Sequence, residues 1–166
     1  MVWGWGPTPL GPSRAARALS GNGDAKRIEV IRQAARQGAA EGWSALFDPP
    51  SKLRYLSASF GTKLIHFAGW RRTGAPRPLI LDRNVAAGLA DAGIRVPGVW
   101  TGTWYLEYLR LAERWAEELG WLSEDGPRSD AIEYTLFDRG RRSARERRRE
   151  AVLARLGELP GQKQPV

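Results

Sequence analysis

One lysine stands out because of its neighbours. Lys63 directly precedes the apolar, helix-like run Leu64–Trp70, in a chain where only four of the 26 basic residues are lysine. Apolar surroundings strip water from an amine and disfavour its charged form. A neutral lysine amine is a nucleophile that can form a Schiff base or attack the C1′ carbon of a sugar. This chemistry needs a nearby carboxylate to stabilise positive charge and assist proton transfer, and Asp82 is the candidate.

Both residues also have a purely structural interpretation. Lys63 could pack its stem on the apolar face of a helix while its ammonium reaches water. Asp82 could serve only as the N-cap of the helix that follows it. Spacing alone favours the structural interpretation for each residue taken singly.

The stretch around Lys63 resembles a known catalytic hairpin. Gly61-Thr62-Lys63 is similar to the end of Leu-Pro-Gly-Val-Gly-Thr-Lys, which carries the nucleophilic lysine of the 8-oxoguanine DNA glycosylases in the helix–hairpin–helix superfamily. In that family a catalytic aspartate that opens a helix follows nineteen residues later, and Asp82 stands at that spacing here. The combination is more specific than the tripeptide alone. The resemblance, over about residues 50–140, implies catalytic roles for Lys63 and Asp82.

A second match to the same family lies downstream. The family's recognition helix carries Gln-x-x-Leu-Phe, in which the Gln reads the edge of the flipped base and the Phe stacks on it. Here the stretch runs from Glu133 to Phe137, and residues four apart share a helix face. A carboxylate can accept from both N–H donors of a guanine edge. The alternatives are a capping box from Asp130 to Glu133 and a plain core position for Phe137.

Other residues are assigned to the same base pocket or to its surroundings. His66 lies one helical turn after Lys63 and could touch the pocket or tune the lysine, although a packed, hydrogen-bonded histidine is the commoner use. Phe67 is assigned to the pocket with it. Trp70 and Trp3 are further aromatic candidates, while most of the eight Trp residues are expected in the core.

The DNA contact is expected at the hairpin. The backbone amides from Ser59 to Lys63 would point at a phosphate, because a helix N-terminus favours an anion. The arginines around the hairpin could flank a duplex, and a second patch runs from Arg139 to Arg149. For that patch a solvated helix face partly paired with Glu146 and Glu150 is the alternative. The DNA-binding assignment comprises Ser59, Phe60, Gly61, Thr62, Arg83 and Asn84.

Three features depart from the family pattern. Ala58-Ser59 replaces the hairpin's Pro-Gly, so one of its two glycines is missing. Asn84 stands where the family has a phosphate-contacting histidine. The additional N-terminal domain of larger members has no room before residue 24, so we expect a minimal helical version without an N-terminal β domain.

The elements that position these residues are predicted to be helical, from caps, breakers and apolar periodicity. A short helix and the helix Thr62–Trp70 would flank a glycine-containing turn, making a helical hairpin. The predicted fold is an all-α compact helical bundle that contains this helix–hairpin–helix motif. The expected helices start at Asp24, Ser51, Thr62, Asp82, 102, Asp130 and about 143, and the expected hairpin turn is Ser57–Gly61.

Composition excludes several classes of protein. The chain has 166 residues, enough for one domain with a core. Without Cys it has no disulfide, zinc-thiolate or iron–sulfur site, and His66 alone cannot build a histidine metal site. No apolar run nears the ~20 residues of a membrane span, and no signal peptide is visible. The net charge of +8 suits a nucleic-acid partner or a soluble basic protein about equally.

Together these observations predict a monomeric DNA repair glycosylase with lyase activity. It would need no metal or organic cofactor, act on double-stranded DNA that contains an oxidised purine, and be cytoplasmic and nucleoid-associated. The alternatives are a non-catalytic helix–hairpin–helix DNA-binding module and a small helical adaptor for protein or RNA. The predicted domains are a Trp-, Gly- and Pro-rich segment 1–23, a helical domain 24–157 and a disordered tail 158–166.

Overall fold

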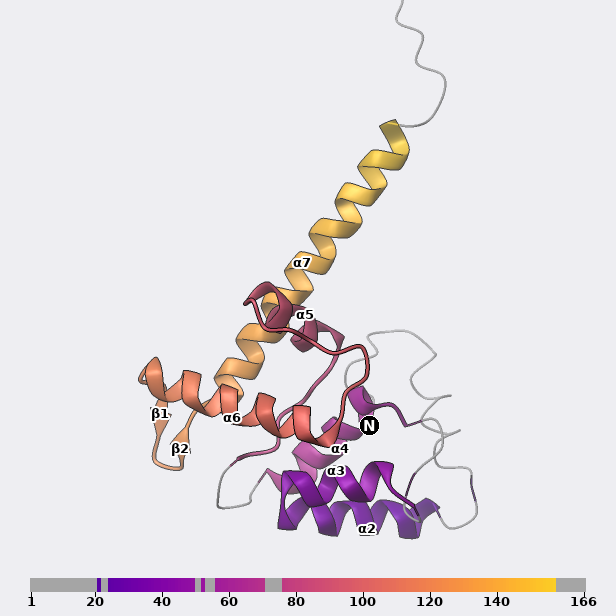
Figure 1. Cartoon of the computed structure of the whole chain (residues 1–166), viewed down its shortest axis with the longest axis vertical. Coiled ribbons are helices and arrows are strands. Elements are labelled where there is room, and N and C mark those ends of the chain that lie inside the picture. The colour runs from indigo at the N-terminus through magenta and orange to yellow at the C-terminus, as the bar shows by residue number, and fades with distance from the viewer. Residues whose placement is uncertain (1–20, 22–23, 50–51, 53–55, 71–75, 158–166) are drawn as a thin grey trace, which may run out of the picture.

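The protein is described here by a computed structural model that covers residues 21, 24–49, 52, 56–70 and 76–157. Within these residues nearly all regular structure is helical, so the all-α prediction is confirmed (Figure 1). The only sheet in them is a two-stranded hairpin, with Leu122 paired to Pro127. The elements are α2 (Asp24–Gln37), α3 (Ala39–Phe47), α4 (Ala58–Gly69), α5 (Arg83–Asp91), α6 (Gly102–Glu118), β1 (Leu122–Ser123), β2 (Gly126–Pro127) and α7 (Ser129–Gly157).

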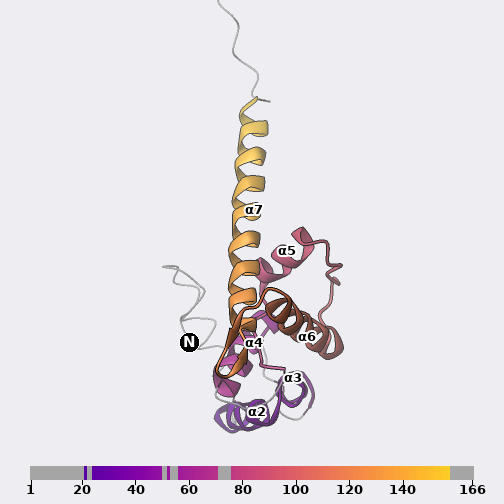
Figure 2. The ribbon, with the colours of Figure 1, turned by 90° about the vertical axis from the view of Figure 1, so that its left-hand side faces the viewer.

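Helices α2, α3 and α4 form one packed group at the base of the molecule (Figures 1 and 2). The sequence predicts one helix from Asp24, but the chain breaks at Gly38 into two helices. The helices approach closely at Gly42, where an added Cβ would lie 3.0 Å from Ala35 Cα and 2.9 Å from Ile65 Cγ2. Ile65 is fully buried at this junction.

An extended segment, Pro78–Asp82, leads through the core to the start of α5. Leu79 and Leu81 in this segment have no exposed surface. They belong to one core cluster with residues of α4, α5, α6 and α7, such as Leu109 of α6. The run is too short to found a sheet, so its backbone polar groups must find partners elsewhere.

Helices α5 and α7 lie side by side in both views of the ribbon (Figures 1 and 2). Two glycines allow this approach. A Cβ on Gly88 would lie 2.0 Å from the Leu136 carbonyl oxygen, and a Cβ on Gly140 would lie 1.9 Å from the Asn84 carbonyl oxygen. The prediction of two helices separated near Gly140 is therefore wrong, because Gly140 is a contact point inside one continuous helix.

The hairpin predicted before Lys63 differs in its second half. The expected turn Ser57–Gly61 is wrong, since Ser57 is the N-cap of α4 and the helix begins at Ala58. The first helix of the hairpin falls mostly outside the described residues, and Leu56 at its expected end is not helical. The helix–hairpin–helix motif as a whole stays a prediction.

The terminal segments assigned from the sequence, 1–23 and 158–166, lie almost wholly outside the described residues. The domain boundaries at residues 23 and 158 stay predictions. Across the part of the chain that the structure covers, no helix combines the length and apolar character needed to cross a membrane.

Candidate active site

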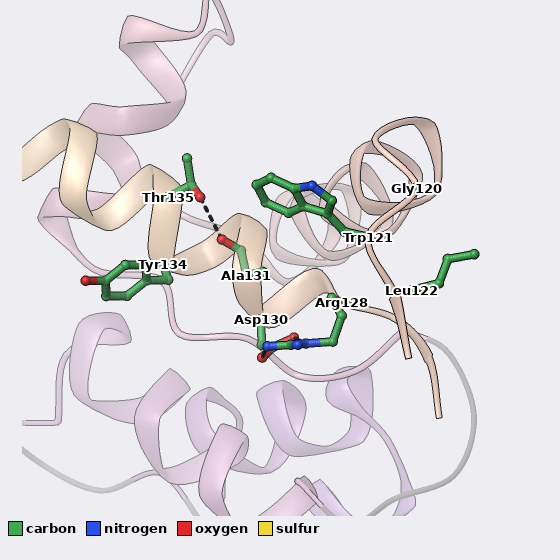
Figure 3. Close-up of a pocket in the computed structure, with 8 residues that line it drawn as sticks. All are labelled: Gly120, Trp121, Leu122, Arg128, Asp130, Ala131, Tyr134 and Thr135. Atoms are coloured by element: carbon green, nitrogen blue, oxygen red, sulfur yellow. Dashed lines mark hydrogen bonds and ion pairs between the residues drawn. The ribbon is translucent and has the colours of Figure 1, made fainter. Parts of the chain in front are cut away.

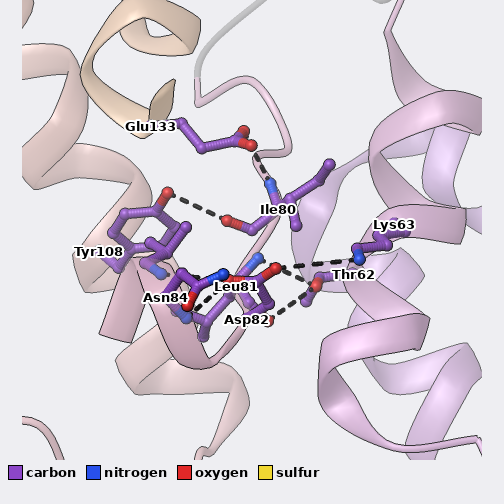
Figure 4. A network of polar contacts seen from close by, with 9 residues as sticks. Thr62, Lys63, Ile80, Leu81, Asp82, Asn84, Tyr108 and Glu133 are labelled. Atoms are coloured by element: carbon purple, nitrogen blue, oxygen red, sulfur yellow. Dashed lines mark hydrogen bonds and ion pairs between the residues drawn. The ribbon is translucent and has the colours of Figure 1, made fainter. Parts of the chain in front are cut away.

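The structure brings Lys63 and Asp82 together at the start of α5. Lys63 Nζ lies 3.8 Å from Asp82 Oδ2, and the two side chains are only 11% and 15% exposed. The ammonium also lies 5.3 Å from the centre of the Phe60 ring. Lys63 sits in the second turn of α4, one turn further into the helix than the predicted turn would place it. Figure 4 shows the lysine reaching across from α4 to the aspartate.

The two carboxylate oxygens of Asp82 have different partners. Oδ1 accepts from the backbone N–H groups of Asn84 (2.9 Å) and Val85 (3.1 Å), which makes Asp82 the N-cap of α5. Oδ2 faces Lys63. The capping interpretation and the ion-pair interpretation are thus compatible, because each uses its own oxygen.

Thr62 connects α4 to the segment that carries Asp82. Its Oγ1 accepts from the Leu81 N–H (3.0 Å) and lies 3.2 Å from the Leu81 carbonyl oxygen, to which it donates. Thr62 has no exposed surface. The hydroxyl therefore fixes the backbone next to Asp82, and the DNA contact assigned to Thr62 through its backbone amide stays a prediction.

Two tyrosines of α6 hold the same segment from the other side. The Tyr105 hydroxyl donates to the Leu79 carbonyl (2.7 Å) and the Tyr108 hydroxyl donates to the Ile80 carbonyl (3.2 Å). Burial raises the pKa of both phenols, and the Glu133 carboxylate raises it further. Neither tyrosine was predicted to act on this segment. The available signal was the general rule that a buried tyrosine hydroxyl finds a partner.

The predicted phosphate-binding amides are largely used within α4. The N–H groups of Phe60 and Gly61 donate to the Ser57 carbonyl, at 3.0 and 2.8 Å. Gly61 is buried, and a Cβ there would lie 1.9 Å from Leu46 Cδ2. The DNA contact predicted through these two amides is wrong, because they close the first helical turn. The N–H of Ser59 remains a candidate for phosphate binding, since an N–H in the first turn of a helix has no intrahelical partner.

The other residues assigned to DNA stand at the start of α5. Arg83 is its first residue and is exposed. Asn84 is half-buried; its N–H is bonded to Asp82 and its carbonyl oxygen faces Gly140 of α7. Of the arginines expected to flank a duplex, Arg77 donates to the Asp125 carbonyl instead (2.6 Å). Arg54, Arg71 and Arg72 lie outside the described residues.

A pocket of ≈ 1020 Å³ opens beside the Lys63–Asp82 pair. Its surface is mainly apolar, and three of the predicted pocket residues line it together with Lys63. The exposed rings of Phe67, Trp70 and Tyr134 stand at it. Its lining comprises Phe60, Lys63, Leu64, His66, Phe67, Trp70, Ile80, Asp130, Glu133 and Tyr134.

Glu133 supplies a buried carboxylate to this pocket. Its Oε2 accepts from the Ile80 N–H at 2.9 Å. Burial raises the pKa of Glu133 to about 7; the Ile80 hydrogen bond opposes this rise and the charge of Asp82 adds to it. The carboxylate thus bonds the extended segment across the pocket wall rather than the start of its own helix.

His66 is held in the pocket wall by packing and one hydrogen bond. Its Nδ1 lies 2.8 Å from the Pro78 carbonyl oxygen, an acceptor, so Nδ1 carries the hydrogen. Burial lowers the pKa of His66, which favours the neutral ring. The ring meets Phe67 edge to face and Trp70 at a tilt, with centroids 5.1 and 4.9 Å away. The packed interpretation and the pocket-lining interpretation both describe this side chain.

Phe137 was assigned to the pocket and does not line it. It is partly buried against the hydrophobic core. Tyr134, 71% exposed and one residue after Glu133, occupies the pocket instead. Tyr134, Leu64 and Asp130 were not predicted for this pocket, because a helical repeat shows which residues share a face but not which element covers that face.

A second pocket of ≈ 610 Å³ adjoins the first and shares Asp130 and Tyr134 with it (Figure 3). Trp121, 38% exposed, stands on one side. Arg128 and Asp130 form two parallel hydrogen bonds of 2.9 Å. The Arg128 charge is therefore already paired within the pocket. No group of three metal-ligating side chains is found among the described residues.

Comparison with known proteins identifies a family. A family described as putative 8-oxoguanine DNA glycosylase OGG-like protein matches residues 1–137. No curated protein and no solved structure matches the chain. The match covers most of the chain and includes Lys63, Asp82 and Glu133. The chain belongs to this family of 8-oxoguanine DNA glycosylase-like proteins.

Proposed function

We propose that the protein is a DNA base-excision glycosylase with associated lyase activity, which removes an oxidised purine of the 8-oxoguanine type. The observation that carries this proposal is the 3.8 Å approach of Lys63 Nζ to Asp82 Oδ2 beside an aromatic-lined pocket. A nucleophilic amine, a carboxylate and a pocket for a planar ring are the groups that such a reaction requires. The family membership supports the same reaction class.

The first step is displacement of the base. Asp82 Oδ2, 3.8 Å from Lys63 Nζ, takes the proton that Lys63 must lose, and the free amine then attacks C1′ of the flipped nucleotide. The bond from C1′ to the base nitrogen breaks, its electron pair leaves with the base, and the base takes up a proton. The Asp82 carboxylate stabilises the positive charge that develops on the sugar.

The second step is strand cleavage. The nitrogen lone pair forms a C=N bond to C1′ while the ring oxygen O4′ leaves and takes up a proton, which gives a protonated Schiff base. Loss of a proton from C2′ then expels the 3′-phosphate by β-elimination. The strand is nicked 3′ to the lesion, and water hydrolyses the imine to release Lys63.

Base recognition falls to Glu133 and the aromatic pocket wall. One carboxylate oxygen of Glu133 is engaged by the Ile80 N–H, which fixes the orientation of the group. The ionised carboxylate can accept from the N1–H and N2–H donors of a guanine-type edge. Phe67, Trp70 and Tyr134 offer π faces for stacking on an unstacked base.

DNA binding is assigned to the start of α4 and the start of α5. The first-turn N–H of Ser59 and the exposed guanidinium of Arg83 can each contact a phosphate. We propose double-stranded DNA with a damaged base as the substrate and a monomer as the active form. The catalytic chain would require no cofactor.

Borohydride trapping tests this proposal. A duplex with one 8-oxoguanine is incubated with the protein and borohydride, which reduces a Schiff base to a stable adduct. We expect an adduct with the wild type and none with Lys63→Gln. Lys26→Gln, which changes an exposed lysine of α2, is the matched control and should trap like the wild type.

The negative outcomes separate the alternatives. If the wild type binds the lesion duplex but gives no adduct with it or with an abasic site, the protein is a non-catalytic DNA-binding module. If single-stranded RNA binds as tightly as the lesion duplex, the adaptor interpretation is favoured. If Lys63→Gln traps as well as the wild type, Lys63 is not the nucleophile.

A further inference from the structure

The C-terminal half of α7 projects well beyond the rest of the protein in both views (Figures 1 and 2). We call residues 141–155 the arm. The body holds the helix just before and at the base of the arm: Arg139 donates to the Asp91 carbonyl (2.6 Å), and the Ser143 hydroxyl bonds the Asp91 carboxylate. From residue 145 to 155 the side chains are exposed. The family match ends at residue 137, so it assigns no role to the arm.

Four arginines of the arm share one face of the helix. Arg145, Arg148 and Arg149 are neighbours at spacings of three and four, and Arg155 returns to the same side two turns after Arg148. Glu146 and Glu150 each stand two residues from Arg148, which puts them on the opposite side of the helix. Glu146 borders this face at Arg149, and Arg147 lies on the glutamate side. The sequence therefore builds an arginine face with a mixed face opposite it.

The arginine face is not neutralised within the described residues. Arg141 and Arg142 pair with Asp138 at the base of the arm. No ion pair within 4.0 Å involves the four arginines of the face or the two glutamates, as far as the described chain extends; the four are Arg145, Arg148, Arg149 and Arg155. The pairing with Glu146 and Glu150 that the sequence left open is thus not formed.

A polyanion would stabilise an unpacked helix with this charge pattern. Isolated helices of this length are marginal in water, and like charges three and four residues apart destabilise them further. A row of phosphates removes that repulsion and offers acceptors for guanidinium groups. A row of phosphates is also what lies on either side of a lesion in duplex DNA.

We propose that the arm binds the phosphate backbone of double-stranded DNA about one helical turn away from the base pocket. Glu133 in the pocket and Arg155 near the arm's end are on one straight helix, so they are ~33 Å apart at 1.5 Å per residue. Ten base pairs of B-DNA at ~3.4 Å each cover the same length. The proposal rests on the proposed function in taking DNA as the polyanion.

The test is the salt dependence of binding to a lesion-free duplex of about 20 base pairs, followed by anisotropy between about 50 and 200 mM salt. One variant replaces the four face arginines by Gln. If each contacts one phosphate, the slope of log K against log salt falls by about 3 to 4, since each contact contributes ~0.9. A charge-matched control replaces four exposed body arginines, Arg36, Arg95, Arg110 and Arg114, and should change the slope by less than about 1.

Two further variants sharpen the result. Arg→Lys at the four face positions keeps the charge and should retain most of the slope. Glu146→Gln with Glu150→Gln removes the opposing charge and should tighten binding. Lengthening the duplex on one flank of a lesion from about 4 to about 12 base pairs should raise the affinity of the wild type but not of the Gln variant, given the ~33 Å reach. Circular dichroism checks that α7 remains folded.

Several outcomes would overturn the proposal. Equal decreases of the salt slope in the arm variant and the body control would show that net charge alone, and not the arm, determines binding. Arm-dependent binding to phosphatidylglycerol vesicles, with DNA binding unchanged, would assign the arm to membranes. An unchanged DNA slope together with a mass change in Val152→Glu/Leu153→Glu would make it a self-association helix. Borohydride trapping, with Lys63→Gln as its control, measures lyase activity separately from the salt slope of DNA binding. A negative trapping result would therefore leave the result for the arm intact.

Discussion

At the scale of single residues, the site depends on carboxylates that serve two partners. Asp82 caps α5 with one oxygen and faces Lys63 with the other. Glu133 bonds the Ile80 N–H from inside the pocket. Because each group has a structural bond as well as a proposed chemical role, substitutions must be chosen to remove one and keep the other.

Asp82→Asn separates the two roles of Asp82. The amide oxygen can still accept from the amides of Asn84 and Val85, so we expect the melting temperature to change little. Base excision should fall by about 10²–10⁴-fold, because the charge and the proton acceptor are gone. Asp82→Ala should lose activity and also about 1 kcal/mol of stability. Melting and single-turnover excision measure the two; lost stability with unchanged excision in the Asn variant would reduce Asp82 to a cap.

Glu133 gives the protein a distinctive pH dependence of stability. Its pKa in the fold is about 7, above the ordinary 4.5, so the protonated form stabilises the fold below about pH 4.5 and this contribution is lost as the pH rises to about 7. Asp82 and Asp130 raise this pKa and Lys63 lowers it. The pKa of His66 is lowered, so its contribution to stability decreases as the pH falls, whereas that of Glu133 increases.

Glu133→Gln isolates that contribution. We expect the free energy of unfolding of the wild type to fall relative to that of the variant between about pH 4.5 and 7. The slope of this fall corresponds to at most one bound proton, and the difference should stay constant above about pH 7. Urea unfolding at a series of pH values measures it. Glu124→Gln, on the exposed hairpin turn, should leave the profile unchanged. A parallel profile for Glu133→Gln would show that this carboxyl is ionised normally.

At the scale of elements, the backbone of the extended segment Pro78–Leu81 is hydrogen-bonded by side chains rather than by a neighbouring strand. Side chains from α4, α6 and α7 bond the backbone of Pro78–Leu81, and these bonds set where Asp82 begins α5 (Figure 4). Buried backbone groups otherwise carry a large desolvation cost. The position of the Lys63–Asp82 pair therefore depends on residues outside the pair itself.

Thr62→Val tests this dependence. The shape is kept, but Leu81 loses partners for both its N–H and its carbonyl, so we expect about 2 kcal/mol of destabilisation. Thr135→Val is the matched control, because its hydroxyl bonds only the Ala131 carbonyl of its own helix on an exposed face (Figure 3); it should cost less than about 0.5 kcal/mol. Equal costs in chemical denaturation would contradict the role of Thr62.

The contact of α5 with α7 depends on the absence of a side chain. Gly140→Ala would place a methyl group against the Asn84 carbonyl, so we expect about 1–3 kcal/mol of destabilisation despite the better helix propensity of Ala. Gly98→Ala meets no atom within 4 Å and serves as the control. Thermal melting compares them; a stabilised Gly140→Ala would show that the helices can separate without cost.

At the scale of the whole molecule, local signals in the sequence predicted most helices, and the family resemblance predicted that Lys63 and Asp82 pair. The N-cap residue type of Asp82 and the apolar run after Lys63 were visible locally. The break at Gly38 and the continuity through Gly140 were not, because they depend on which helix lies opposite. The bonds of Thr62, Tyr105 and Tyr108 join residues 19 to 28 positions apart, beyond the reach of periodicity.

Because α7 is a single rod from Glu133 to the arm, the angular phase between pocket and arm is set by residue count. Each inserted residue turns everything beyond it by ~100° and advances it by ~1.5 Å. Two alanines inserted between Ala144 and Arg145 should turn the arginine face away from the duplex and lower the salt slope. Seven inserted alanines should restore the direction of the arginine face and shift it further along the DNA. If binding returns with seven inserted residues and not with two, the continuous helix sets the orientation of the arginine face relative to the pocket.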